Sequence, residues 1–441
     1  MEIALPECPA EANPDYDSID WFTDQTLVSD PYPYFDHQRA QCPVLKTQNY
    51  GVYAVTGYEE ASEVYKNADL FSSCIAVGGP FPPLPFTPEG SDISDQIEEH
   101  RDEFLMSEHM VTMDPPRHSR AKSLLNRLLT PKRLKENEDF MWPLADRFLD
   151  DFIDKGRCEF LNDYAKPFSL LVIADLLGVP EEDHEEFRQM LAPRPGNTVG
   201  SLQGEVMEHN PLQWLEDKFC AYLEDRRANP RDDILTALAT AKYPEGDTPE
   251  IIDVVKSATF LFAAGQETTT KLLSAAMRVL AEHPDVVERL RSDRTRIPAF
   301  VEEMLRMESP VKSAFRLAKK DTELAGVKIP AGTILMINPG AINRDPRHFD
   351  HPHDFDIDRP NVREHLAFSR GAHSCPGGPL ARVEGRVSLE RILDRMANIR
   401  LDEEFHGPEG ARKFNYEPTF ILRGLVDIHI TFDKIPASVD R

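Results

Sequence analysis

Long apolar runs are missing from this sequence of 441 residues. No stretch comes near the roughly 18 consecutive apolar residues that a membrane-spanning helix needs. Met1 to Phe22 also lack the basic and apolar regions of a signal peptide, because this segment is acidic and interrupted by Pro6, Pro9 and Pro14. We therefore predict a cytoplasmic protein without a membrane partner, in which residues 1–20 form an irregular extension.

Basic residues are scarce compared with acidic ones. The chain contains 50 Lys and Arg against 76 Asp and Glu, which gives a formal net charge of −26. Such a charge keeps a protein in solution and is repelled by the phosphates of nucleic acids and by acidic membrane surfaces. We therefore predict no nucleic-acid partner.

Cysteines are few and widely scattered. None of the 6 belongs to a CxxC pair, which argues against a disulfide framework and against a zinc site built from cysteines. A GxGxxG segment and a Walker sequence are missing as well. The chain therefore offers no flavin or nicotinamide site, and a redox reaction on it would need electrons from outside.

Helical spacing of apolar residues dominates the pattern. No repeat, low-complexity tract or linker divides the chain, so we predict a single domain over residues 1–441. The expected helices are Pro116–Leu129, Lys132–Phe152, Ser169–Leu177, Leu212–Asn229, Ile251–Glu282, Pro298–Met307 and Pro379–Met396. The expected strands are Val52–Thr56, Thr333–Asn338, Phe420–Leu422 and Val426–Phe432. The predicted fold class is mainly α with a small β portion.

Two stretches rich in proline or glycine predict irregular loops. Gly78–Ser94 reads GGPFPPLPFTPEGSDIS, and Pro193–Asn210 lies between two helical patterns. Long loops in a compact domain are often lids or binding loops, and a disordered surface insertion is the alternative. Phe81 and Phe86 favour a binding loop for the first stretch, because disordered tracts contain few aromatic residues.

Cys375 lies in the segment Phe368–Gly378, which reads FSRGAHSCPGG and leads into an expected helix. The positive end of a helix and its free N–H groups favour a thiolate at that place. A thiolate is one of the few protein ligands of haem iron, and it favours cleavage of the O–O bond. Gly371 and Gly377 would let the backbone approach a flat macrocycle closely. For a lone cysteine, an ordinary buried thiol is the alternative interpretation.

The spacing of Phe368, Gly371, His373, Cys375 and Gly377 resembles the haem-binding loop of the cytochrome P450 family, and this signature is a specific one. The resemblance extends over nearly the whole chain. It implies a mainly α fold with small β-sheets, shaped like a triangular prism around a buried haem b. It also implies that Cys375 is the axial ligand of the haem iron, with Phe368 and Gly377 beside the haem.

A second part of the resemblance is a charge network. Glu303 and Arg306 match the family's ExxR pair, and Arg359 in the segment FDIDRP matches the arginine that completes the network. Pairs at this spacing decorate many exposed helices and are a weak signal alone. In order with the cysteine loop they imply a buried, structural network that is costly to break by removing one member.

The third part lies near the middle of the longest expected helix, in the segment Ala264–Thr269. It is similar to the family's acid–alcohol pair, which implies that Glu267 and Thr268 are catalytic and deliver protons for oxygen activation. Ala264 and Gly265 would lie at the haem. The hydroxyl of Thr268 can bond to the carbonyl of Ala264 and open the helix there. An ion-paired or surface Glu267 and a core Thr268 are the alternative.

Haem carries two carboxylates that need cationic partners when they are buried. The segment DPPRH, which ends at His118, resembles a family motif, and Lys122 faces the same side of the expected helix. The family usually has arginine where Lys122 stands, so the charge is kept but the bidentate fork is lost. Arg316 and His373 match the remaining carboxylate ligands. For His118 taken alone, an incidental exposed histidine is the alternative.

Pro376 limits the hydrogen bonds that the sulfur of Cys375 can accept. Backbone N–H groups that point at a thiolate tune the potential of the iron, and proline has no N–H. We therefore predict that Cys375 accepts hydrogen bonds only from Gly377 and later residues.

Electrons must reach the chain from a partner. The resemblance implies a small acidic ferredoxin, served by a separate ferredoxin reductase. Docking on such an acidic chain needs a local basic patch. The candidates are Lys132, Arg133, Lys135, Arg363 and Arg370.

The implied activity is that of a soluble, monomeric, bacterial-type monooxygenase. It would insert one oxygen atom of O2 into an apolar organic substrate of small to medium size, such as a terpenoid, a steroid or an aromatic compound. Lys312 or Arg194 could instead anchor a carboxylate. The residues expected to line the substrate pocket are Phe81, Leu84, Phe86, Phe260, Val311, Ala314 and Phe420.

Two other functions fit the same signatures. A peroxide-driven haem-thiolate enzyme would need no ferredoxin, and the intact pair of Glu267 and Thr268 argues against it because peroxide brings its own protons and electrons. A non-enzymatic haem sensor would bind ligands without forming product.

Overall fold

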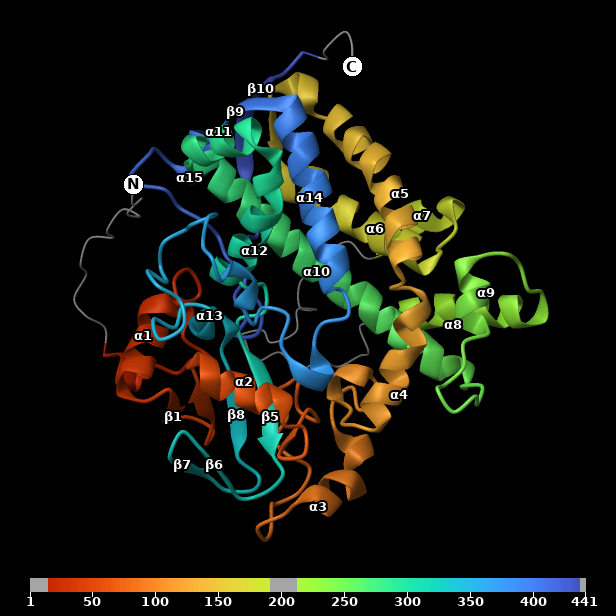
Figure 1. The fold of residues 1–441 in the computed structure, drawn as a ribbon, viewed down its shortest axis with the longest axis vertical. Helices are drawn as coiled ribbons and strands as arrows, with labels where there is room; N and C mark the ends of the chain where they lie inside the picture. Colours follow the sequence, from red (N-terminus) through yellow and green to blue (C-terminus); the bar gives the residue numbers. More distant parts are fainter. Residues whose placement is uncertain (1–14, 191–211, 437–441) are drawn as a thin grey trace.

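The computed structural model describes residues 15–190 and 212–436. Within them, helices fill most of the molecule, and short strands gather at its two ends (Figure 1). Cys8, Arg194 and the predicted loop Pro193–Asn210 lie outside the described residues, as do the first 14 residues of the expected N-terminal extension.

The described part of the chain contains fifteen α-helices, and a π-helical turn at Leu161–Ala165 leads into the sixth. No helix in this part has both the length and the hydropathy that crossing a bilayer would require. The helices are α1 Tyr32–Gln41, α2 Tyr58–Lys66, α3 Ser94–Glu99, α4 Arg117–Ser123, α5 Pro131–Asp150, α6 Lys166–Leu177, α7 His184–Met190, α8 Gln213–Ala228, α9 Ile234–Ala239, α10 Ile251–Glu282, α11 Pro284–Ser292, α12 Ile297–Met307, α13 Pro339–Ile342, α14 Gly378–Arg395 and α15 Glu403–His406.

The strands form three small sheets. A five-stranded sheet has the order β1-β2-β8-β5-β3, in which only β2 and β8 run parallel. A three-stranded antiparallel sheet has the order β4-β10-β9 and lies at the opposite end of the molecule (Figure 1), and β6 pairs with β7. The strands are β1 Val44–Lys46, β2 Tyr53–Val55, β3 Phe71–Ser72, β4 Arg157–Glu159, β5 Ala314–Ala318, β6 Thr322–Leu324, β7 Val327–Ile329, β8 Ile334–Ile337, β9 Met396–Leu401 and β10 His429–Lys434.

Helix α10 crosses the centre of the molecule (Figure 1). Its bounds agree with the predicted helix, and its 32 residues span about 48 Å. It packs against α6, α8 and α14, and α6 is apolar along almost its whole length, so that α10 is enclosed. In its middle, Ala263–Thr268 are nevertheless only partly buried. A central helix with accessible residues indicates an internal space beside it.

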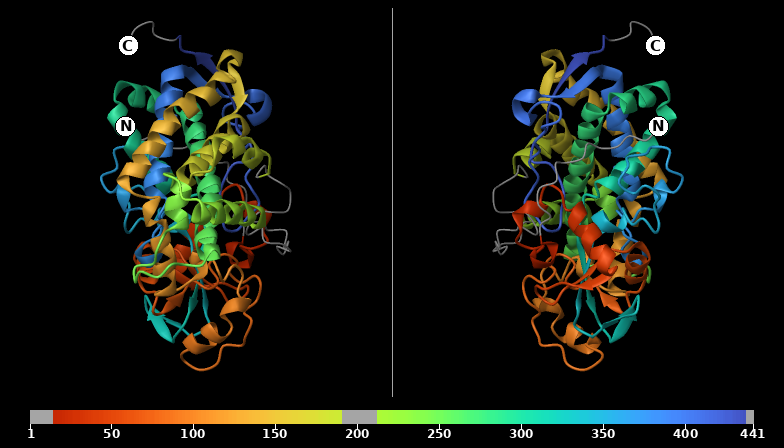
Figure 2. Two further views of the ribbon diagram at one scale, coloured as in Figure 1. Left: turned by 90° about the vertical axis from the view of Figure 1, so that its right-hand side faces the viewer. Right: turned by 90° about the vertical axis from the view of Figure 1, so that its left-hand side faces the viewer.

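The hydrophobic core has a helical part and a sheet part. Side chains of α5, α6, α10, α12 and α14 form the largest cluster, and a second cluster joins the five-stranded sheet to aromatic residues near the N-terminus, Trp21 and Phe22 among them. In the side views the N-terminal elements lie against this sheet (Figure 2). The predicted mainly α fold with small sheets is confirmed.

Three sequence predictions concern connecting segments. The stretch from Gly78 to α3 is irregular, as predicted. The helix predicted over Pro116–Leu129 ends as α4 at Ser123 and continues only as a 3-10 turn. The strand predicted over Phe420–Leu422 is reduced to one isolated antiparallel bridge between Leu422 and Val311, and residues 420 and 421 form a bend. The hydroxyl oxygen of Thr419 accepts a hydrogen bond from the N–H of Leu422 at 2.8 Å.

Candidate active site

The segment Phe368–Gly378 forms a tight loop that ends where α14 begins. The N–H of Cys375 donates to the carbonyl of Phe368 at 2.9 Å and closes the loop. Gly371 has a left-handed conformation, and a Cβ on it would lie 2.5 Å from the carbonyl oxygen of Tyr65 in α2. Glycine is thus required at 371 by the packing of the loop on α2, a reason that the sequence did not indicate.

The sulfur of Cys375 accepts hydrogen bonds from the N–H groups of Gly377 and Gly378 at the start of α14. The predicted restriction to Gly377 and later residues is therefore confirmed. Burial raises the pKa of the Cys375 thiol, whereas the two N–H groups and the nearby charge of Lys122 act to lower it. The loop thus offers a thiolate the contacts that it needs, at a place where burial opposes the charge.

Three basic side chains converge beside this loop. The rings of His118 in α4 and His373 in the loop lie 3.9 Å apart between their centroids. Burial and the neighbouring positive charges, Arg316 of β5 among them, lower the pKa of His118 to about 4 and that of His373 to about 2. The Nδ1 atom of His118 is buried without a hydrogen-bond partner among the described residues.

Asp114 is the carboxylate nearest to this cluster, and its oxygens are already engaged. They accept hydrogen bonds from the hydroxyl of Ser72 at 2.5 Å and from the N–H of Ser73 at 2.8 Å. Arg101 lies 3.4 Å from the same carboxylate. Asp114 therefore acts on His118 and Arg316 only through its charge, and within the described chain no carboxylate forms an ion pair with either of them or with His373.

Lys122 makes a contact that the sequence did not predict. Its amine donates to the carbonyl oxygens of Ala372 at 2.9 Å and Ser374 at 2.7 Å. These bonds tie α4 to the cysteine loop, and burial lowers the pKa of Lys122. Lys122 therefore holds the loop, and a contact with a haem carboxylate stays a prediction.

The predicted acid–alcohol pair lies on the accessible stretch of α10. The hydroxyl of Thr268 donates to the carbonyl of Ala264 at 2.8 Å, as predicted. The helix does not open there, because α10 is regular from Ile251 to Glu282. The Thr268 hydroxyl therefore keeps its lone pairs available for a hydrogen bond from another donor.

Glu267 is ion-paired, as the alternative interpretation allowed. Its Oε1 atom lies 3.2 Å from the amine of Lys271, one helical turn further on. The amine also lies 2.7 Å from Glu417 in the C-terminal part of the chain. Among the described residues, none bonds to the Oε2 atom of Glu267.

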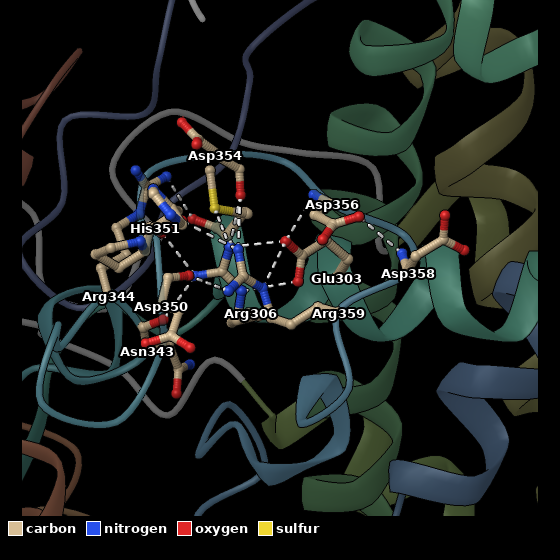
Figure 3. Close-up of polar contacts among 12 residues, drawn as sticks. Glu303, Arg306, Asn343, Arg344, Asp350, His351, Asp354, Asp356, Asp358 and Arg359 are labelled. Atoms are coloured by element: carbon tan, nitrogen blue, oxygen red, sulfur yellow. Dashed lines mark hydrogen bonds and ion pairs between the residues drawn. The ribbon is translucent and has the colours of Figure 1, made fainter. Parts of the chain in front are cut away.

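Glu303, Arg306 and Arg359 form a buried network (Figure 3). The side chain of Arg306 donates to both oxygens of Glu303 at 2.7 Å, and Nε of Arg359 lies 3.2 Å from Glu303. Remaining guanidinium donors bond to backbone carbonyls, such as those of Asn343 at 2.9 Å and Asp354 at 3.0 Å. The network therefore pins an irregular segment of the backbone to α12.

A second network, absent from the sequence predictions, begins at the neighbouring Glu302. Its carboxylate lies 2.9 Å from Nε2 of His365, and Arg382 in α14 donates to it as well. Burial would raise the pKa of Glu302, but hydrogen bonds from His365 and Arg382 lower it to about 2. The guanidinium of Arg382 also lies over the ring of Phe368 at 4.7 Å, so this network supports the cysteine loop.

Comparisons with known proteins agree with this geometry. A family model described as cytochrome P450 matches residues 209–398. Cytochrome P450 144 of Mycobacterium tuberculosis is 32% identical over 375 residues, which cover 84% of this chain and 84% of the relative. The chain belongs to the cytochrome P450 family.

The steroid C26-monooxygenase of Mycolicibacterium smegmatis is 34% identical over 374 residues, with 83% of this chain and 85% of the relative covered. The solved structure of substrate-free cytochrome P450 CYP150A6 from Mycobacterium marinum has 64% sequence identity and a TM-score of 0.90, and the match covers 96% of this chain and 100% of that one.

The P450 family implies a haem iron as cofactor, and two observations fit it. Cys375 is accessible although burial dominates its pKa, which is the combination expected of a sulfur that faces an internal space. The buried charge of Arg316 lies with the rings of His118 and His373, and none of the three forms an ion pair with a carboxylate of the described residues, so the two carboxylates of a haem would supply the anion.

The residues predicted for the substrate pocket of this P450 do not all belong to one cluster of side chains. Phe81 and Phe420 meet at the buried Phe22, with ring centroids 5.5 and 5.1 Å from it. Phe22 is not among the residues predicted for the pocket, because no motif or spacing marks it. Phe260 lies on α10, where its ring is 6.1 Å from that of His109. The other members pack against the cluster of Phe22 or lie partly buried on β5, and they are Leu84, Phe86, Val311 and Ala314.

The basic residues predicted for ferredoxin docking differ in how exposed their side chains are and in whether those side chains already bond to other residues. Arg133 is wrong as a docking residue, because its side chain is only 11% exposed and bonds to Asp175 at 2.9 Å. Arg370 donates to hydroxyl groups of Ser62 and Tyr58, both at 3.1 Å. Lys132 has an 88% exposed side chain, so it is the freest of these three.

Replacing Arg306 by methionine should destabilise the protein strongly. The change leaves the fully buried Glu303 without its main partner, which typically costs about 3–5 kcal/mol. Thermal unfolding should therefore occur at a clearly lower midpoint, and less haem should copurify. The control is Arg289→Met, which removes only the exposed ion pair with Asp358 and should cost at most about 1 kcal/mol. Equal midpoints for the two variants would contradict a structural role of the buried network.

Replacing Lys122 by methionine should weaken the cysteine loop. It removes two hydrogen bonds from a charged donor, each worth about 1.5–3 kcal/mol, and a positive charge near the sulfur. We expect the reduced, carbon-monoxide-treated protein to lose its red-shifted Soret band faster on standing than the unchanged protein does. Arg120→Met is the control, since Arg120 lies on the same helix but contacts exposed carboxylates and the ring of Tyr243, not the cysteine loop. Equal rates in the two variants would show that the Lys122 contact does not stabilise the loop.

Proposed function

We propose that this P450 monooxygenase holds haem b through the thiolate of Cys375 and oxidises an apolar organic substrate with electrons from a ferredoxin and its reductase. One observation carries the proposal. Cys375 is accessible as a residue although burial raises the pKa of its thiol, and two backbone N–H groups at the start of α14 point at its sulfur.

Residues around the proposed haem divide its binding between them. His118, Arg316 and His373 would pair with the haem carboxylates. Ala264 and Gly265 on α10, with Phe368 and Gly377 in the cysteine loop, would line its faces. When bound, the haem iron supplies the reductive activation of dioxygen.

The overall reaction fixes what the protein residues must do. One oxygen atom enters the substrate, and two electrons and two protons reduce the other atom to water. The hydroxyl of Thr268 already donates a hydrogen bond to the carbonyl of Ala264, so its oxygen would accept a hydrogen bond from a water molecule. Glu267, whose Oε2 atom has no partner in the described chain, would take protons from solvent and pass them on.

The proposed substrate is a terpenoid, steroid or aromatic compound. The aromatic cluster of Phe22, Phe81 and Phe420 favours an apolar body, and a relative 34% identical is named a steroid C26-monooxygenase. An anchored carboxylate is the alternative. Lys312 is buried, lies 5.1 Å from the ring of Trp21, and has its pKa lowered to about 7 by burial. A partly neutral amine is a weak anchor, which favours the uncharged substrate.

Replacing Cys375 by alanine should abolish the thiolate ligand. We expect the reduced, carbon-monoxide-treated protein to show a Soret band at about 450 nm, and the Cys375→Ala variant to lack this band. Product formation with NADH, ferredoxin and reductase should disappear with the band. A variant that keeps the band would refute the proposal. Turnover of the unchanged protein with peroxide alone would favour the peroxide-driven alternative, and bound ligands without product would favour a sensor.

Replacing Thr268 by alanine should uncouple electron consumption from product formation. Positioned proton donors typically supply about 10²–10⁴-fold in rate, and we expect product per NADH to fall by at least the lower end of that range, with hydrogen peroxide released instead. The control is Thr259→Ala, because Thr259 makes the same bond to the carbonyl four residues back, at 2.9 Å, but lies outside Ala264–Thr269. An equal fall in both variants would point to helix stability rather than proton delivery.

A further inference from the structure

Lys271 is a buried cation next to the proposed catalytic acid. Its side chain is only 4% exposed, and its amine lies between the carboxylates of Glu267 at 3.2 Å and Glu417 at 2.7 Å. Both carboxylates are more accessible, at 41% and 27%. A buried amine needs such partners, since desolvation of an unpaired charge is costly.

Glu417 belongs to a hairpin, Tyr416–Leu425, that closes over Lys271. Tyr416 and Leu425 form a bridge, and the N–H of Glu417 donates to the carbonyl of Gly424 at 3.0 Å. A Cβ at position 424 would lie 2.5 Å from Cγ of Lys271. The hairpin is thus shaped around the stem of this lysine, and position 424 leaves no room for a side chain.

The same hairpin carries Phe420 into the aromatic cluster of the proposed substrate pocket. The ring of Phe420 lies 5.1 Å from that of Phe22 and 6.0 Å from that of Phe81. The hairpin is also held from the other side, because the N–H of Lys312 donates to the carbonyl of Ile421 at 2.8 Å. One cation therefore connects the acid of α10 with a wall of the pocket.

We infer that Lys271 is a positioning residue for Glu267. It fixes the Oε1 atom of the carboxylate and leaves Oε2 for proton exchange, and Glu417 holds the amine in that place. The inference rests on the proposed function of Glu267. Without Lys271 the carboxylate could turn toward solvent, since it is partly exposed and has no second partner in the described chain.

The test measures coupling in the haem-loaded protein with NADH, ferredoxin and reductase. In Lys271→Met we expect product per NADH to fall about tenfold, less than the loss of a direct proton donor can cause, with hydrogen peroxide released in proportion. The solvent isotope effect on product formation should increase, because proton delivery becomes slower. The Soret band at about 450 nm should remain, since the change at position 271 does not touch the proposed thiolate ligand.

Two further variants keep the test decisive. Glu417→Gln retains the lysine and its packing on Gly424, so it should fold even where Lys271→Met does not. Its coupling should fall about two- to threefold, less than the roughly tenfold or more that losing a charged hydrogen bond outright would cause, because the glutamine oxygen still accepts from the lysine amine. Lys256→Met is the control on the same helix, because Lys256 pairs with the exposed Glu108, and its coupling should not change.

A double-mutant cycle separates positioning from a general structural effect. In a Glu267→Gln background, Lys271→Met should cause no further loss of coupling, because a positioning residue acts only through its partner. Independent, additive losses would overturn the inference alone, and so would unchanged coupling in both Lys271→Met and Glu417→Gln. A Glu267→Gln variant that stays fully coupled would overturn the proposed role of Glu267 and the inference with it.

Discussion

The negative charge that the proposed haem ligation places on the sulfur of Cys375 would have to be stabilised inside the protein, and much of the surrounding architecture is consistent with that constraint. Burial raises the pKa of the thiol, and the N–H groups of Gly377 and Gly378 oppose it. Those N–H groups are available only because α14 begins directly after the loop. A sulfur held elsewhere in the core would meet the same cost of burial without the compensating donors.

The loop needs rigid support if those donors are to stay in place, and α12 provides it through two adjacent glutamates. Glu303 binds Arg306 and Arg359 and pins the irregular backbone before the loop. Glu302 binds His365 and Arg382 and so holds the start of the loop and α14. Neighbouring residues on a helix point about 100° apart, so one short helix can serve both networks.

Predictions from the sequence succeeded for features that are determined by residues close together in the chain. The bounds of α10, the bond from Thr268 to Ala264 and the donors to Cys375 all follow from local spacing or from proline chemistry. Contacts between distant segments could not be read in this way. Lys271 and Glu417 are 146 residues apart, and Glu302 and His365 are 63 apart. The strand predicted at Phe420–Leu422 shrinks to a single bridge from Leu422 to Val311, 111 residues away, because residues 420 and 421 form a bend.

The distribution of charge links the cofactor to the fold. The chain carries a net charge of −26, yet the region beside the cysteine loop is basic, with His118, Lys122, Arg316 and His373 close together. Burial and the neighbouring positive charges lower the pKa of both histidines, so protonation of either ring is disfavoured in the chain alone. The two carboxylates of a haem would oppose that effect, and a ligand that binds only the folded chain stabilises it by mass action.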